Sequence, residues 1–164
     1  MYENYKKYPE CISACRCRNI VFDKNGLAKT YNYWSIYDKK DNTPSFNLLA
    51  TTGGGTLFPP NIINISKRDI PLIYRFLTAD DIFLKYKMDE KNIKISCAYN
   101  GLSYKPQKES IDTSSLCFKN TCGEQLNNNY IKLANIKYRE KNPEKIIISM
   151  TSWKNRIDKV YKVV

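Results

Sequence analysis

The sequence contains no histidine, and this absence removes a whole class of catalytic sites. A Ser-His-Asp or Cys-His nucleophile cannot be assembled from this chain alone, so any general base is a carboxylate, a lysine, a tyrosine or a thiolate. A run of about 18 apolar residues is also missing, and the first stretch, MYENYKKYPE, lacks the apolar segment of a signal peptide. We therefore expect a cytoplasmic protein, with peripheral contact at the inner face of the membrane as an open alternative.

Acidic residues are few relative to basic ones, and the formal net charge is +11, from 27 Lys and Arg against 16 Asp and Glu. Such a charge suits nucleic acid, an anionic membrane face or an acidic substrate. The lysines are scattered, however, and often interleaved with acids, as in KYKMDEKNIK and KYREKNPEK. We expect a solvated lysine-rich surface, and nucleic acid is not an expected partner.

The six cysteines stand at positions 11, 15, 17, 97, 117 and 122. Their spacings, C-x3-C-x-C and C-x4-C, do not form the two matching knuckles of a zinc site. Without a secretion signal, reduced thiols that fill small apolar spaces are expected. A zinc site built from Cys11, Cys15, Cys17 and a distant cysteine stays as an alternative.

Short apolar strands alternate with helical patterns along the chain, which predicts an α/β fold. Hydrophobic residues make up 42% of the sequence and aromatic residues 13%, enough to bury the core of one domain. We expect a lead-in over 1–10, strands over 11–23, 45–52 and 93–99, a turn over 23–26, a loop over 100–115, and helices over 70–78, 79–92 and 122–142.

Glycine is scarce, with six residues in the whole chain, yet three of them stand together as Gly53, Gly54 and Gly55. Glycine loses more backbone freedom on folding than any other residue, so the run needs a reason. It permits positive φ angles, and it lets another group approach the backbone, whose N–H groups can face phosphate or sugar oxygens. A tight bulged turn without a ligand is the alternative.

A pair of aspartates, Asp80 and Asp81, stands where the helix over 79–92 is expected to begin. Carboxylates at a helix N-terminus gain about 1 kcal/mol from capping and from the helix dipole, which is one explanation for the pair. The other explanation is that one carboxylate takes a proton from an acceptor hydroxyl, as an inverting sugar transfer requires.

The glycines and the aspartates occur together in FNLLATTGGGTLFPPNIIN…TADDIFLKYK, which resembles a family of bacterial surface-polysaccharide glycosyltransferases of GT-A type. Members of that family carry a Gly-Gly-x-Leu-Tyr/Phe-Pro-Pro segment followed by an Ala-Asp-Asp-Ile/Val/Trp helix start. The flanking stretches YPECISACRCRNIVFDKNG…YNYW and CGEQLNNNYIKL extend the resemblance over most of residues 8–133. It implies a partial GT-A-like mixed sheet with flanking helices, and a role in capsule or lipopolysaccharide synthesis.

Carried over residue by residue, the resemblance implies that Gly53, Gly54 and Gly55 line the junction between donor diphosphate and acceptor. Asp81 would be the base that deprotonates the acceptor hydroxyl. Asp80 would orient that hydroxyl or cap the helix.

The resemblance also implies that Trp34, with Tyr31 or Tyr33, stacks on a sugar face, although packing in the core explains these rings equally well. Arg16 and Arg18 would meet donor phosphates, or would share one solvent face of an alternating strand.

The chain departs from the family because it has no Asp-x-Asp motif, which holds the Mn²⁺ or Mg²⁺ that neutralises the leaving diphosphate in such enzymes. Residues 1–142 would then be the C-terminal, acceptor half of a catalytic domain, incomplete at the nucleotide-binding half. Residues 143–164, with SMTSWKNRI, resemble the first strand and helix of a second such domain.

For the chain alone we expect little or no turnover of a nucleotide-sugar. The expected ligands are a nucleotide-sugar and a saccharide acceptor, and a polypeptide that supplies the missing nucleotide-binding half is a candidate partner. A non-catalytic saccharide- or polyanion-binding module is the alternative function.

Overall fold

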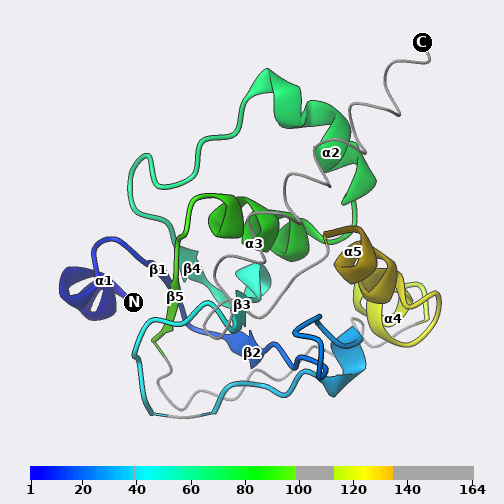
Figure 1. Ribbon diagram of the computed structural model, residues 1–164, viewed down its shortest axis with the longest axis horizontal. Helices are drawn as coiled ribbons and strands as arrows, with labels where there is room; N and C mark the ends of the chain where they lie inside the picture. Colours follow the sequence, from blue (N-terminus) through cyan, green and yellow to red (C-terminus); the bar gives the residue numbers. More distant parts are fainter. Residues whose placement is uncertain (39, 99–112, 135–164) are drawn as a thin grey trace.

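The computed structural model describes residues 1–38, 40–98 and 113–134, which form a mixed α/β fold (Figure 1). In chain order the elements are α1 (Tyr2–Lys7), β1 (Ile12–Ala14), β2 (Cys17–Asn19), η1 (Tyr31–Tyr33), β3 (Leu48–Ala50), η2 (Thr52–Gly54), β4 (Thr56–Leu57), η3 (Lys67–Asp69), α2 (Ile70–Arg75), α3 (Asp80–Glu90), β5 (Ile95–Cys97), α4 (Leu116–Thr121) and α5 (Leu126–Ala134). The α/β class expected from the sequence is confirmed. Within residues 1–38, 40–98 and 113–134, every helix lacks the length or the apolar character that a bilayer-spanning segment needs.

The main sheet has three short strands in the order β4–β1–β5. β1 runs antiparallel to β4, with Ser13 opposite Leu57, and parallel to β5, with Ser13 opposite Ser96. Parallel strands need a long crossover, and the chain between β1 and β5 contains α2 and α3. A second sheet pairs β2 with β3 antiparallel, with Arg18 opposite Leu49.

The single strand expected over 11–23 is wrong, because the chain divides into β1 and β2, which belong to different sheets. The break falls at Cys15 and Arg16, where the chain meets the glycine segment. The Cys15 N–H donates to the Gly55 carbonyl at 2.9 Å, and the Thr51 N–H donates to the Arg16 carbonyl at 3.0 Å. The Cys15 N–H and the Arg16 carbonyl are therefore satisfied by Gly55 and by Thr51, which precedes the glycine bend.

Two helices and a turn follow the sequence-based expectations. The helix over 79–92 is confirmed as α3, and the helix over 70–78 as the shorter α2 preceded by η3. In the turn, the Gly26 N–H donates to the Asp23 carbonyl at 3.0 Å, and Gly26 has a φ of 75°, which glycine adopts without strain.

The region after residue 112 differs from the sequence-based expectation. Of the helix expected over 122–142, the described residues contain α5, and residues 135–142 lie outside them; α4, which precedes it, had not been expected. The Ser115 hydroxyl caps α4 by accepting the Phe118 N–H at 3.1 Å. Most of the loop expected over 100–115 and the whole of 143–164 lie outside the described residues.

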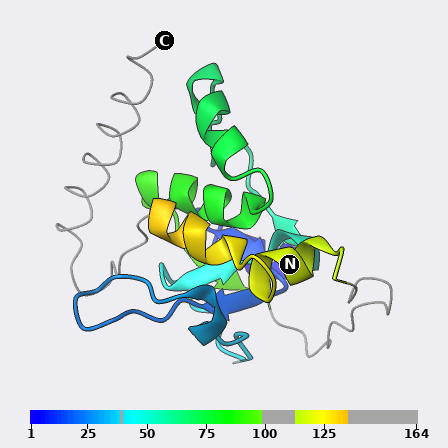
Figure 2. The same cartoon turned by 90° about the vertical axis from the view of Figure 1, so that its right-hand side faces the viewer.

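Helix α3 is buried along most of its length, because it packs between two parts of the core. Its residues Ile82 and Phe83 enter a cluster that contains Trp34 and Phe76, while Met88 enters a second cluster around β1, β3 and β5. Helix α5 packs beside α3 (Figures 1 and 2). The position of α3 is therefore fixed from several sides, and so is the place of the aspartates at its start.

The C-terminal half of α3 also holds a buried ion pair. Lys85 is only 1% exposed, and its Nζ donates to Asp89 Oδ1 at 2.9 Å and to the Phe46 carbonyl at 2.6 Å. A buried charge is tolerated only when it is paired and hydrogen-bonded, and both conditions are met here.

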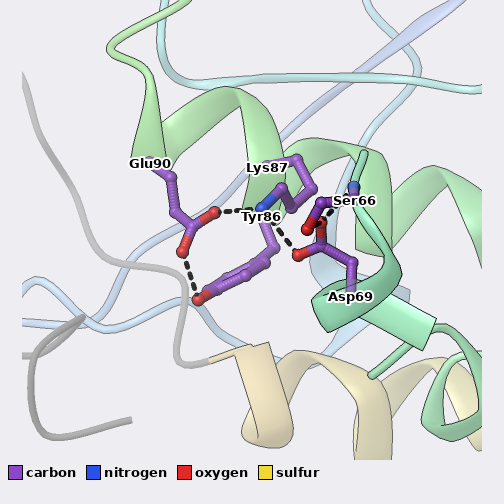
Figure 3. Close-up of polar contacts among 5 residues, drawn as sticks. All are labelled: Ser66, Asp69, Tyr86, Lys87 and Glu90. Atoms are coloured by element: carbon purple, nitrogen blue, oxygen red, sulfur yellow. Dashed lines mark hydrogen bonds and ion pairs between the residues drawn. The ribbon is translucent and has the colours of Figure 1, made fainter. Parts of the chain in front are cut away.

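A second polar network on α3 anchors the segment that leads into α2 (Figure 3). Lys87 Nζ lies 2.9 Å from Asp69 Oδ1 and 2.6 Å from Glu90 Oε2, and the Tyr86 hydroxyl donates to Glu90 Oε1 at 2.7 Å. The Ser66 N–H donates to Asp69 Oδ2 at 2.7 Å. Burial by itself would raise the pKa of Asp69, but the hydrogen bonds from Ser66 and Lys87 outweigh burial and hold this pKa below its ordinary value.

Candidate functional site

The three glycines lie in a tight bend between β3 and β4, and the fold itself explains two of them. A Cβ on Gly54 would lie 2.5 Å from the Cβ of Arg16, so the backbone passes against the Arg16 side chain only because Gly54 has none. Gly55 has a φ of 94°, which other L-residues rarely adopt.

Gly53 is different, because nothing in the structure demands a glycine there. Apart from its chain neighbours, no heavy atom of the described residues lies within 4 Å of a Cβ built on Gly53, its φ is not positive, and the residue is exposed. The space in front of Gly53 is therefore open to a molecule from solution.

The bend and the start of α3 meet through a direct contact. The Thr52 hydroxyl donates to Asp80 Oδ2 at 3.0 Å, although the two residues are 28 positions apart in the sequence. Asp80 is exposed at the first position of α3, so its carboxylate stands at the surface beside the glycines. The structure thus brings together the two features that the sequence singled out.

Asp81, the next residue, is partly buried, and one of its carboxylate oxygens, Oδ1, accepts the Ile82 N–H at 2.9 Å. Burial is the main cause that raises the pKa of Asp81 to about 6, and the neighbouring Asp80 charge adds to the increase. Hydrogen bonds from the backbone and the charge of Arg18 oppose this effect only in part. A carboxylate with such a pKa is half ionised in slightly acidic solution and is suited to accept a proton.

Arg18 contacts the aromatic residues, and its charge also acts on Asp81. Its Nη1 donates to the Trp34 carbonyl at 2.6 Å, and its guanidinium lies 4.7 Å from the centre of the Tyr31 ring. The Nε atom is buried and makes no hydrogen bond within the described residues. Arg18 is therefore held by its partners in a fixed place near Asp81.

The aromatic residues expected to stack on a sugar lie in the core. Trp34 is 1% exposed and its indole N–H donates to the Lys29 carbonyl at 3.0 Å, while Tyr31 is buried against it with ring centres 5.4 Å apart. Of the two explanations that the sequence left open, the structure shows packing in the core. Tyr33 has a different place: it is 65% exposed, with Lys29 Nζ 5.4 Å from the centre of its ring.

The cysteines and carboxylates do not form a metal site within the described part of the chain. No group of three or more His, Cys, Asp or Glu side chains is placed there to hold a metal ion. All six cysteines are free thiols. A hydrogen bond with Cys97, and burial after it, raise the pKa of Cys17 far above its ordinary value, so this thiol stays protonated.

Two neighbours of the glycines could not have been found from sequence patterns. Thr52 reaches Asp80 only through the tertiary fold, and no local motif distinguishes it from Thr51. Met1 is the other: its Cε lies 3.6 Å from the position of a Cβ on Gly55. Helix α1 fixes this end of the chain, because Asn4 Nδ2 donates to the hydroxyl of Ser96 at 2.8 Å.

The candidate site thus consists of the bend at Thr52–Gly55 and the two carboxylates at the start of α3, with Arg16 and Arg18 alongside. Comparison with known proteins adds no family to this description. The sequence matches no protein-family model, no curated protein and no solved structure.

Proposed function

We propose that this chain carries the acceptor side of a sugar-transfer site, in which Asp81 takes the proton from a saccharide hydroxyl. The observation that carries the proposal is the Thr52–Asp80 hydrogen bond, which joins the glycine bend to the acidic helix start. The open space at Gly53 supports it, because a sugar ring can approach the backbone there without meeting a side chain.

The two carboxylates would have different roles in the proposed site. Asp80 is exposed and charged, so it can accept a hydrogen bond from a second hydroxyl of the acceptor and orient the ring. Asp81 has the pKa of about 6 that a base needs if it is to be ionised near neutral pH yet still accept a proton.

The proposed reaction is a single displacement at the anomeric carbon of a nucleotide-sugar. The proton of the acceptor hydroxyl moves to Asp81 while its oxygen forms a bond to the anomeric carbon. The bond from that carbon to the diphosphate breaks in the same step, and the electron pair leaves with the diphosphate. The configuration at the anomeric carbon is inverted.

The finer fold assignment belongs to the same proposal. The small mixed sheet, with β1 parallel to β5 and antiparallel to β4, supports a partial GT-A-like arrangement that carries the acceptor half. The Mn²⁺ or Mg²⁺ expected for a complete enzyme belongs to the Asp-x-Asp motif, which this sequence lacks. The proposed roles of this chain therefore involve no metal.

The proposal is tested by saccharide binding. We expect the purified chain to bind a subset of an immobilised array of bacterial oligosaccharides, and the best oligosaccharide is then titrated by calorimetry. Gly53→Val should weaken this binding at least about tenfold, because the added side chain fills the open space over the bend. Asp80→Asn should have an effect of similar size, because it removes a charge-assisted hydrogen bond.

Asp38→Asn is the matched control, since Asp38 is an exposed aspartate in another loop and should leave the affinity unchanged. Folding of each variant is checked by circular dichroism. Absence of binding to every oligosaccharide would contradict the proposal, and so would a Gly53→Val variant that binds as well as the unmodified chain.

A further inference from the structure

Helix α2 and the residues beside it expose an apolar stripe that the proposed function does not use. Ile70 and Tyr74 are four residues apart on α2, so they lie on one side of the helix, and Leu77 follows two residues after the helix ends. Tyr74 and Leu77 are each 71% exposed, and Ile65 and Ile70 are each 46% exposed. Large apolar side chains gathered on one exposed face mark a surface that binds something.

The other side of α2 explains why this stripe points outward. Leu72 and Phe76, also four residues apart, are buried in the core cluster around α3. Both views show α2 standing away from the body of the protein (Figures 1 and 2). Because the inner side of α2 packs against the core, the stripe on its outer side stays exposed to solvent.

The same surface is strongly basic. Lys67, Arg68 and Arg75 are all exposed beside the stripe. The only acid between residues 65 and 78 is Asp69, and it turns inward to Lys87 and Ser66 (Figure 3). The Asp69 carboxylate, which could have neutralised this surface, is thus paired with Lys87 instead.

We propose that this surface docks on a membrane that contains acidic phospholipid. We name it the α2 patch and define it as Ile65, Lys67, Arg68, Ile70, Tyr74, Arg75 and Leu77. Apolar side chains with a tyrosine among them suit the headgroup region of a bilayer, and flanking Lys and Arg bind lipid phosphates. The patch projects from the molecule, as insertion into a membrane surface requires, and its charge is of one sign.

The experiment is flotation of the full chain with vesicles of phosphatidylcholine, with and without 30% phosphatidylglycerol. We expect binding only to the acidic vesicles, and a loss of binding in high salt because surface charges are then screened. Tyr74→Ser combined with Leu77→Ser should weaken binding at least about tenfold. Replacing Lys67, Arg68 and Arg75 by Gln should weaken it about 100-fold, at roughly a factor of five for each charge.

Two controls separate the patch from the general properties of the chain. Replacing Lys24, Lys29 and Lys40 by Gln removes the same charge from other exposed positions, and Tyr2→Ser removes another exposed tyrosine ring, from α1. Both variants should bind acidic vesicles nearly as well as the unmodified chain.

Three results would overturn the inference: no binding to acidic vesicles, unchanged binding of the Tyr74→Ser, Leu77→Ser variant, or an equal loss in the lysine control. Sedimentation velocity is measured in parallel. Self-association that the Tyr74→Ser, Leu77→Ser variant abolishes, without vesicle binding, would assign the patch to a second copy of this chain instead. Saccharide binding at Gly53 is read separately, so the failure of one proposal does not imply the failure of the other.

Discussion

At its C-terminal end, helix α3 carries Lys85 and Lys87, whose ammonium groups both lie within 3 Å of a carboxylate oxygen. At its N-terminal end it carries Asp80 and Asp81, and neither of these makes an ion pair within the described residues. Asp80 is held by the Thr52 hydroxyl, while Asp81 accepts only backbone N–H groups and has a raised pKa. The same helix thus places its two cations in ion pairs at its C-terminal end, while the two carboxylates of its first turn form no ion pair within the described residues.

The two ends of α3 therefore differ in how their charges affect stability: the ion pairs stabilise the fold, whereas the buried charge of Asp81 lowers its stability. The two lysines fasten α3 to neighbouring segments, and the pKa of Lys87 is raised because its two carboxylate partners outweigh the effect of burial. Asp81 is partly buried at a cost, and the fold gains little from its charge. Groups that reduce stability without structural benefit are concentrated at functional sites. The contrast therefore favours a functional role for the N-terminal end of α3.

The largest expected effect comes from breaking the buried pair. Lys85→Met removes the cation from Asp89 and from the Phe46 carbonyl, and should lower the free energy of unfolding by about 3–5 kcal/mol. Urea denaturation measures the change. The double variant Lys85→Met, Asp89→Leu should recover most of the loss, because two well-packed apolar residues can replace an ion pair. A single variant as stable as the unmodified protein would show that this end is not structural.

Asp81→Asn is expected to change stability in the opposite direction, by raising the free energy of unfolding. The folded-state pKa of Asp81, about 6, lies above the ordinary value of 3.8, so the folded protein loses stability as the pH rises through this window. Below pH 3.8 the carboxyl group is mostly protonated in the folded and in the unfolded protein, so stability is unaffected. Above about pH 6 it is ionised in both, and the free energy of unfolding is lower by about 3 kcal/mol. The variant should therefore be more stable by up to about 3 kcal/mol at pH 7.5, with no gain near pH 3.5.

Thermal unfolding of Asp81→Asn at several pH values checks this prediction. Asp38→Asn is the matched control, because Asp38 is an exposed aspartate in another loop and its replacement should leave stability nearly unchanged. A variant that is less stable at pH 7.5 would mean that the ionised Asp81 serves the fold, and the comparison between the two ends of α3 would then fail.

The glycine bend offers a third test through two identical substitutions at adjacent positions. Gly54→Ala should cost about 2 kcal/mol, because the new Cβ would lie 2.5 Å from the Cβ of Arg16 and the backbone must shift. Gly53→Ala should change stability by less than about 0.5 kcal/mol, since no other part of the described chain lies within 4 Å of the new Cβ. Chemical denaturation of both variants compares them, and equal losses would show that Gly53 also serves the fold.

The smallest expected effect concerns the network around Lys87. Asp69→Asn should cost about 1 kcal/mol at pH 7, because it weakens a partly exposed ion pair and the bond from Ser66. The folded-state pKa of Asp69 is lowered, so its contribution is present above the ordinary value of 3.8 and is lost as the pH falls through the folded-state pKa. The difference between the two proteins should therefore shrink in acid, and a constant difference in urea titrations from pH 7 to pH 2 would contradict this.

The sequence predicted local features better than contacts between segments. The helical spacing of apolar residues located α3, and the Asp-Lys-Asn-Gly run located the turn that ends at Gly26. The pattern over 11–23 did not reveal the break at Cys15, because the partners of that backbone come from the glycine segment some 40 residues later. Tertiary hydrogen bonds of this kind leave no periodic signal in the chain.

The sequence identified the residues of the candidate site, but it could not show which of them serve the fold and which face open space. The sequence marked three glycines alike, whereas the structure explains Gly54 by a close approach and Gly55 by its positive φ, and leaves Gly53 open. Trp34 had two interpretations in the sequence, and only the packing of α3 against it shows that the ring is buried. The proposed sugar transfer, drawn first from a resemblance, stays a prediction.

The position of Met1 has a practical consequence for all of these experiments. Its side chain lies beside Gly55, so a purification tag fused to this end would begin next to the surface whose ligand is sought. Such a tag could block a weak saccharide or mimic one, and either artefact would resemble a genuine result. Protein for binding studies is therefore best prepared with an N-terminus that carries no added residues.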